Sequence, residues 1–169
     1  MAQSFADDLW QDDEEQEGVW ETEYWKHVRA TFPNFDSVES AVGHFDFGTV
    51  PVKSNLRKGV QFTVNDTRLL VQQSSRPSVR SSRKSALEKD ELRYLMIVQQ
   101  IEVEPAMRRK GRCTETLRAL IEAAAKRQLD VMVQCVHNKY LAQLLCDKFG
   151  ATNDPYADDN YIIHTERSP

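Results

Sequence analysis

Residues 103–114 read Val-Glu-Pro-Ala-Met-Arg-Arg-Lys-Gly-Arg-Cys-Thr. The segments before and after this stretch predict the order of the secondary structure around it. Before them, residues 94–103 form a long apolar run, which predicts a strand that ends at Pro105. After them, Leu117, Leu120 and Ala124 recur at helical spacing, which predicts an amphipathic helix. The stretch is therefore a basic turn that joins a strand directly to a helix.

Such a turn is suited to binding an anion. The first N–H groups of a helix have no intrahelical partners, and the helix dipole adds partial positive charge there. Gly111 lets a phosphate approach the backbone closely. The surrounding polar side chains are those of Arg108, Arg109, Lys110, Arg112 and Thr114. We expect a ligand with more than one phosphate, such as a pyrophosphate; the alternative is a basic helix start on a solvated surface.

The known nucleotide-binding glycine motifs do not fit this turn. A Walker A loop needs G-x-x-x-x-G-K-[ST], and the dinucleotide fingerprint needs several glycines, whereas only Gly111 is present. If the turn binds a phosphorylated ligand, it does so by another mode.

The chain after the turn alternates strands and helices. Residues 131–136 predict a buried strand, and Asn138 is a good N-cap for a helix that ends near Gly150. Residues 161–164 predict a last short strand. The order strand, helix, strand, helix, strand implies helices packed on a sheet with a right-handed crossover.

The chain before the turn carries weaker signals. Residues 59–64 and 68–73 predict a hairpin around Asn65-Asp66, and residues 20–31 predict a helix that Pro33 ends. Residues 34–57 predict a loop with a short helix near 38–42. Residues 74–91, rich in serine and arginine, predict a flexible loop, with contact to a phosphate or an acidic partner as the alternative.

Charge is distributed unevenly. The chain has 26 acidic and 22 basic residues, and residues 1–25 hold nine of the acids and no base, so the remainder carries a balance of +5. Residues 1–19 therefore predict an acidic, mobile arm before a single domain at 20–169. All three tryptophans lie within the first 25 residues, so the arm either packs as a helix or docks on a protein partner.

Composition excludes some classes of protein. No apolar run approaches the roughly 20 residues of a membrane span, and no signal-peptide core follows the N-terminus. Three cysteines, Cys113, Cys135 and Cys146, lack the spacing of a disulfide framework or a zinc site. We expect a cytoplasmic protein with no metal; a place in a virion is an alternative.

The turn also carries a family resemblance. Residues 103–113 read V-x-P-x-x-R-x-x-G-x-C, which resembles motif A of the GCN5-related N-acetyltransferase (GNAT) superfamily, V-x-P-x-x-[RQ]-x-x-G-x-[GA]. Residues 145–151, Leu-Cys-Asp-Lys-Phe-Gly-Ala, resemble the family's L-Y-x-K-x-G-F. The resemblance covers about residues 92–165. It implies an α/β (α+β) fold, a GNAT-like mixed twisted sheet flanked by helices, in a divergent member, with a phage as one candidate source.

The resemblance implies acetyl-CoA, or another acyl-CoA, as cofactor. The strand backbone at Ile101 and Val103 would pair with the pantetheine arm, and Asn138 would be a further ligand or only a helix cap. The pyrophosphate would lie on the turn formed by Arg108, Arg109, Lys110, Gly111, Arg112, Cys113 and Thr114. Cys113 stands where the family has Gly or Ala, and Cys146 where it often has a tyrosine general acid.

The implied reaction is direct attack of an amine on the thioester. A lysine-like amine has a pKa near about 10.4, so a base must remove its proton. The candidate bases are Glu102, Glu104 and His137. Cys146 either protonates the departing CoA or is simply buried on an apolar helix face. Cys135 and His137 share a strand face, which is either a nucleophile–base dyad or, as we favour, a coincidence of spacing.

Two other functions stay open. The chain could be a catalytically inactive GNAT-fold binding or structural protein, for example a phage virion or host-interaction component. It could also bind nucleic acid through the serine- and arginine-rich loop and the basic turn, but the modest charge of the body and the acidic arm argue against this. The expected acceptor is an amine of a protein or of a small molecule.

Overall fold

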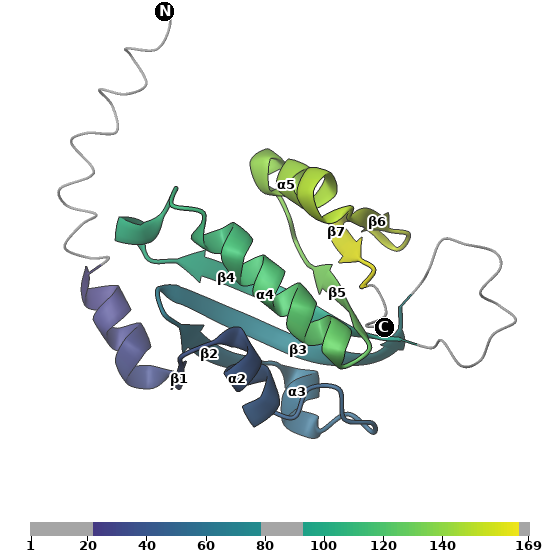
Figure 1. Ribbon diagram of the computed structural model, residues 1–169, viewed down its shortest axis with the longest axis horizontal. Helices are drawn as coiled ribbons and strands as arrows, with labels where there is room; N and C mark the ends of the chain where they lie inside the picture. The colour runs from purple at the N-terminus through teal and green to yellow at the C-terminus, as the bar shows by residue number, and fades with distance from the viewer. Residues whose placement is uncertain (1–21, 79–92, 166–169) are drawn as a thin grey trace, which may run out of the picture.

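The computed structural model describes residues 22–78 and 93–165, which form one seven-stranded sheet in the order β1-β2-β3-β4-β5-β7-β6 (Figure 1). The strands are β1 (Asn34–Phe35), β2 (Val60–Val64), β3 (Thr67–Pro77), β4 (Tyr94–Val103), β5 (Leu129–Val133), β6 (Thr152–Asp154) and β7 (Ala157–Ile163). Strands β1 and β2 pair in parallel, as do β4 and β5, and the other pairs are antiparallel. The predicted mixed sheet is confirmed.

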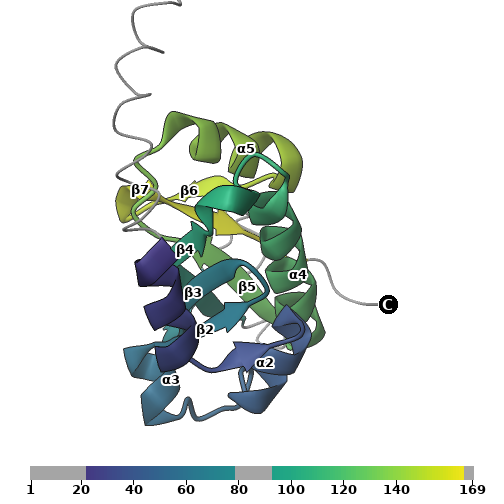
Figure 2. The same ribbon diagram turned by 90° about the vertical axis from the view of Figure 1, so that its left-hand side faces the viewer.

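Helices cover both faces of this sheet. Residues 22–31 are helical, and the later helices are α2 (Val38–His44), α3 (Ser54–Lys58), α4 (Arg112–Lys126) and α5 (Lys139–Phe149). In Figure 2 the N-terminal helix and α3 lie on one side of the sheet, and α2 and α4 lie on the other. Within the described residues, no helix has the length and apolar character that crossing a membrane requires.

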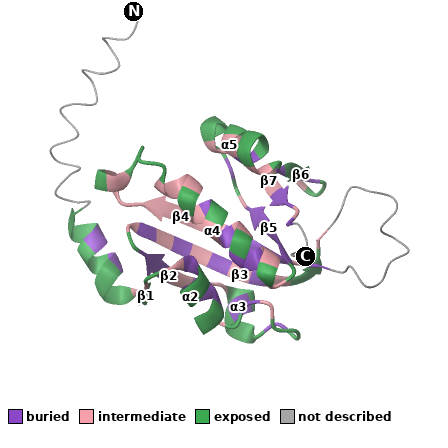
Figure 3. Cartoon of the chain, in the orientation of Figure 1, coloured by how far each residue is buried: buried purple, intermediate pink, exposed green. Residues whose placement is uncertain are grey.

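Buried residues of the main core cluster lie on α4 and on the strands of the sheet (Figure 3). Leu117, Leu120 and Ala124 of α4 are completely buried, as the helical spacing predicts, and they pack in one cluster with Met96 and Val98 of β4. Burying a leucine side chain contributes about 1.5–3 kcal/mol, so this face holds α4 firmly on the sheet. The start of α4 is thereby held beside the end of β4.

The ends of the long helices follow local signals in the sequence. The Asn138 side-chain oxygen accepts hydrogen bonds from the backbone N–H groups of Tyr140 (2.8 Å) and Leu141 (3.3 Å), so Asn138 caps α5 as predicted. Gly150 ends α5 with a left-handed φ of 63°. Trp25 and Val28 of the N-terminal helix are buried, as its apolar face predicts.

The short elements were missed. Residues 34–57, predicted as loop, contain β1, a longer α2 and α3. β3 continues through Pro77, into the segment 74–91 predicted as a flexible loop, because it pairs with β4 as far as Tyr94. β6 was missed as well, since strands of two or three residues carry no periodic signal. The arm at 1–19 and residues 79–91 lie outside the described residues.

Candidate functional site

The two parallel strands β4 and β5 separate halfway along β4. Their ladder runs from Tyr94 opposite Leu129 to Val98 opposite Val133. The Gln134 N–H then donates to the Val98 carbonyl oxygen at 3.0 Å. β5 ends there, and β4 continues for five more residues, paired with β3 alone. The backbone of β4 on the β5 side is therefore left without a strand partner.

A bulge in β4 lies at the same point. Val98 is opposite Val71 of β3 and Gln100 is opposite Leu70, so Gln99 is an extra residue in the ladder. A bulge bends a strand and increases its twist. The bend accompanies the separation of β4 from β5.

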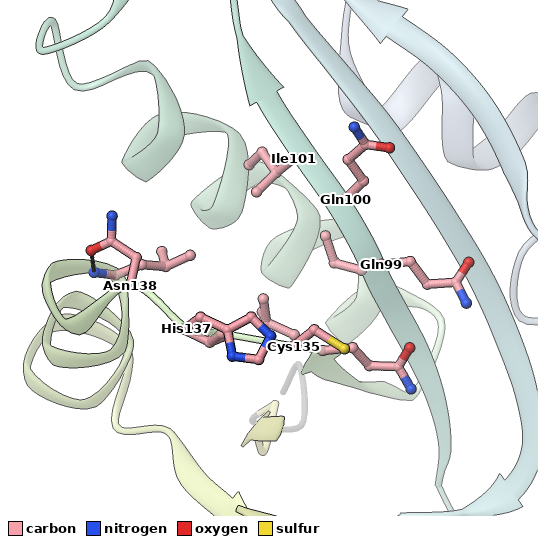
Figure 4. Close-up of a pocket in the computed structure, with 11 residues that line it drawn as sticks. Gln99, Gln100, Ile101, Cys135, His137 and Asn138 are labelled. Carbon is pink, nitrogen blue, oxygen red and sulfur yellow. Dashed lines mark hydrogen bonds between the residues drawn. The ribbon is translucent and has the colours of Figure 1, made fainter. Parts of the chain in front are cut away.

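A cleft of about 300 Å³ opens between the separated strands (Figure 4). Its walls are Val98, Gln99, Gln100 and Ile101 of β4, Val133 to Asn138 of β5 and the segment after it, and Leu141 of α5. In Figure 4 the side chain of Ile101 points from β4 toward Asn138, whereas the amides of Gln99 and Gln100 lie on the other side of β4. The wall that faces β5 is thus apolar side chain and strand backbone.

The turn after β4 presents its backbone to solvent. A short 3₁₀ helix, η3 (Pro105–Met107), leads to Arg109 and Gly111, both in the left-handed region with φ of 60° and 74°. Gly111 is the N-cap of α4, and no side chain caps the helix. A Cβ built on Gly111 would have no atom within 4 Å. The first N–H groups of α4 therefore start at an open space, which is the arrangement that binds anions.

The basic side chains of the turn divide into two groups. Arg109 and Lys110 are exposed, and in the described part of the chain neither forms an ion pair. Arg112 instead lies 3.7 Å from Asp66 and 3.3 Å from Glu115, so acids already match its charge. The structure therefore leaves Arg109 and Lys110 as the side chains best placed to meet an anionic ligand.

The other predicted cofactor residues do not all line the cleft. Ile101 lines the cleft, but Val103 does not, and its carbonyl oxygen accepts a 3.1 Å hydrogen bond from the Arg108 side chain. Cys113 and Thr114 are half-buried in the first turn of α4. Burial raises the pKa of the Cys113 thiol, so this thiol stays protonated near neutral pH.

Glu102 and Glu104, the predicted strand bases, do not line the cleft. Glu102 accepts a 2.9 Å hydrogen bond from the Tyr24 hydroxyl and lies 3.6 Å from Arg68. Glu104 pairs with Arg29. Burial and the bond to Glu102 raise the pKa of Tyr24. These contacts attach the N-terminal helix to the sheet, which is a structural use of both carboxylates.

Of the other two predicted catalytic residues, one borders the cleft. His137 lines it and is exposed. Cys146 does not line it, and the alternative that Cys146 is buried on an apolar face is wrong, because its side chain is exposed. The buried stripe of α5 is centred on Leu145, and the next residue lies about 100° further round a helix of 3.6 residues per turn.

Sequence reasoning missed several residues of the cleft. Gln134, Val136 and Leu141 line it, and Cys135 adds a thiol beside His137. Cys135 has a left-handed φ of 54°, a conformation that the sequence gives no reason to expect at a non-glycine residue. The apolar character of Val136 and Leu141 indicated burial but not a shared cavity.

No family model matches the chain, and no curated protein does. Solved structures similar to it include a mutant of the AtaT toxin bound to the C-terminus of the antitoxin AtaR and acetyl-CoA, at 8% identity and a TM-score of 0.39. That alignment covers 59% of this chain and 58% of the toxin. Naa20 of Chaetomium thermophilum, in complex with a bisubstrate analogue, aligns at 12% identity over 57% of this chain and 56% of that one, with a TM-score of 0.35.

AtaT complexed with acetyl-methionyl-tRNAfMet aligns over 78% of this chain and 85% of the other, at 11% identity and a TM-score of 0.43. At these identities and TM-scores the likeness carries no argument about this chain. The function has to be argued from the cleft and the turn.

Proposed function

We propose that the chain is a GNAT-type N-acyltransferase that moves an acyl group from acetyl-CoA, or a related acyl-CoA, to an amine. The observation that carries the proposal is the separation of β4 from β5 next to the basic, uncapped start of α4. Motif A of the sequence occupies the same place, between the end of β4 and the first turn of α4.

The two parts of the site suit the two parts of an acyl-CoA. A pantetheine arm is an extended chain with two amides, and it can add to the unpaired side of β4 beside Ile101 as a further strand would. Backbone N–H and C=O groups need partners when they are covered, so such pairing is favourable. The pyrophosphate would lie in the open space before Gly111, close to Arg109 and Lys110.

The reaction needs no covalent intermediate. The amine nitrogen attacks the thioester carbonyl carbon, an amide bond forms, the carbon–sulfur bond breaks, and CoA leaves as a thiolate, which takes up the proton that the amine has lost. We assign the proton acceptor for the amine to His137, because it borders the cleft whereas Glu102 and Glu104 do not.

Thermal unfolding with and without acetyl-CoA tests the proposal. A ligand at 100 times its dissociation constant stabilises a protein by about 2.7 kcal/mol. We expect acetyl-CoA to raise the melting temperature of the wild type and to have much less effect on Arg109→Glu. Arg118→Glu is the control, because Arg118 is an exposed base further along α4 and the substitution changes the net charge equally. No rise for the wild type at millimolar acetyl-CoA would refute the proposal.

A second function has support of its own. Cys146 lies away from the cleft, and Glu102 and Glu104 are held by Tyr24 and Arg29. A GNAT-fold protein that binds CoA without catalysis needs none of these three side chains at the cleft. Binding of acetyl-CoA with no CoA release on a panel of amines and amine-bearing peptides would favour this second function over the enzyme.

A further inference from the structure

We propose that Cys135, His137 and Asp159 form a binding site for a transition-metal ion, most suitably Zn²⁺, at the edge of the cleft. One ligand atom from each, the Cys135 Sγ, a ring nitrogen of His137 and a carboxylate oxygen of Asp159, all lie within 4.8 Å of one another. Cys135 and His137 are exposed and Asp159 is half-buried, so an ion can reach them. Figure 4 shows the Cys135 and His137 side chains side by side on the β5 wall.

The backbone brings these three residues together by a kink after β5. Val133 is opposite Tyr161 of β7, so continuing the antiparallel register by two residues places Cys135 near Asp159. Cys135 is in the left-handed conformation, and its N–H donates to the Asn160 side chain at 3.2 Å. The next N–H, of Val136, donates to the Asp159 carbonyl oxygen at 2.8 Å.

This pattern resembles a β-bulge, which redirects side chains at the end of a ladder. Here it turns Cys135 and His137 toward the same residue of β7. Two hydrogen bonds hold the kink, so the ligand positions do not depend on an ion to form. Such preorganisation lowers the cost of binding.

The spacing suits one ion between the three atoms. Three atoms at the corners of a 4.8 Å triangle each lie about 2.8 Å from its centre, whereas zinc bonds are about 2.3 Å to sulfur and about 2.0–2.2 Å to nitrogen or oxygen. Side-chain movements of less than about 1 Å would bring all three into coordination.

The chemistry of the ligands selects the kind of ion. A thiolate, an imidazole and one carboxylate suit zinc and its neighbours, whereas Ca²⁺ and Mg²⁺ need mostly oxygen ligands. The charges of the thiolate and the carboxylate balance a divalent ion. Three protein ligands leave a fourth coordination position, and Cys135 and His137 both border the cleft, so that position is next to the space proposed for the thioester.

The same residues do not form a ready nucleophile and base. No hydrogen bond joins the Cys135 thiol to His137 in residues 22–78 and 93–165, and an activated cysteine needs its base within such reach. An ion bound here would occupy one nitrogen of His137, so the proton-acceptor role proposed above belongs to the metal-free protein.

Cobalt titration of the reduced, chelator-treated full chain tests the site. Co²⁺ is the probe because a cobalt–thiolate bond gives a charge-transfer absorption and a tetrahedral site gives intense visible bands. We expect one equivalent of Co²⁺ to bind with both signals, Zn²⁺ to displace it, and Mg²⁺ to leave it in place. The titration needs no acyl-CoA, so its result tests the metal site independently of the proposed function.

Single substitutions assign the ligands. Removing a group that merely orients a ligand already costs about 10- to 100-fold in affinity, so His137→Ala and Asp159→Asn should weaken binding at least tenfold. Cys135→Ser should abolish the charge-transfer band. Cys146→Ser is the control, since Cys146 is an exposed thiol on α5, outside the cluster.

The proposal is overturned if the wild type shows no charge-transfer band with Co²⁺, or if the band survives in Cys135→Ser. It is also overturned if Cys146→Ser loses the band, because the ion would then bind another thiol. Circular dichroism and thermal unfolding of each variant establish that it is folded before its affinity is compared.

Discussion

Gly111→Ala separates the backbone strain at the turn from its proposed role in ligand binding. Gly111 has a φ of 74°, and a Cβ there meets nothing within 4 Å, so the substitution introduces no clash. An L-residue in the left-handed region costs about 1–2 kcal/mol. For a chain of this size 1 kcal/mol lowers the melting temperature by about 2–4 °C, so we expect a fall of about 2–8 °C.

Gly150→Ala is a matched control. Gly150 has a φ of 63°, and a Cβ there also meets nothing within 4 Å, so its expected loss of stability is the same. It ends α5, whereas Gly111 starts α4 at the proposed pyrophosphate site. The two variants should therefore unfold at similar temperatures without ligand.

Acetyl-CoA should distinguish them. At 100 times the dissociation constant the wild type gains about 2.7 kcal/mol, or about 5–10 °C, and Gly150→Ala should keep that increment. Gly111→Ala should lose most of it, because the added methyl group occupies the space through which a phosphate would approach the backbone N–H groups. Differential scanning fluorimetry measures both quantities. Equal ligand-dependent increments in the two variants would refute this reasoning.

Three further substitutions test the structure. Burial would raise the pKa of the Asp130 carboxyl, but hydrogen bonds from His164, Ser78 and the Thr165 backbone outweigh it, and the pKa is lowered. The ionised carboxylate therefore stabilises the fold above its unfolded pKa of about 3.9. This contribution is lost as the pH falls through the lower pKa of the folded state. Asp130→Asn should cost about 3 kcal/mol in urea unfolding at pH 7, and a deficit that did not shrink below about pH 4 would contradict this assignment. Leu120→Ala, at a fully buried position, should cost about 2–5 kcal/mol by the same assay, and a cost below about 1 kcal/mol would show that α4 is not packed as described. Glu102→Gln should lower the Tyr24 pKa toward its ordinary value in an ultraviolet titration and leave acetyl-CoA binding unchanged. Loss of binding would show that Glu102 does take part in the cofactor site.

Local signals in the sequence were sufficient to predict the strand that leads into the site and the two ends of α5. The apolar run predicted β4 at residues 94–103, which are its bounds in the structure. Asn138 and Gly150 predicted the two ends of α5, because a cap forms between a residue and the N–H or C=O groups of its own helix. The basic turn was predicted to lead directly into a helix, as it does at Arg112, and the resemblance of the turn to motif A implied the ligand class.

The sequence alone did not reveal which side chains face the cleft. Glu102 was a candidate base, but Tyr24, 78 residues earlier in the chain, holds it on the sheet. Arg112 was counted with the free bases of the turn, but Asp66 lies beside it. Both partners come from other elements, so no local pattern contains them.

By itself the sequence determined the strand, the basic turn and the helix, because each depends on neighbours within a few residues. Only the tertiary structure decided where β4 leaves β5, because the bulge at Gln99 is defined by its register against β3. The left-handed Cys135 and its approach to Asp159 likewise depend on β7. Register between strands is set by packing and hydrogen bonds over long sequence separations, and these determine both the cleft and the proposed metal site.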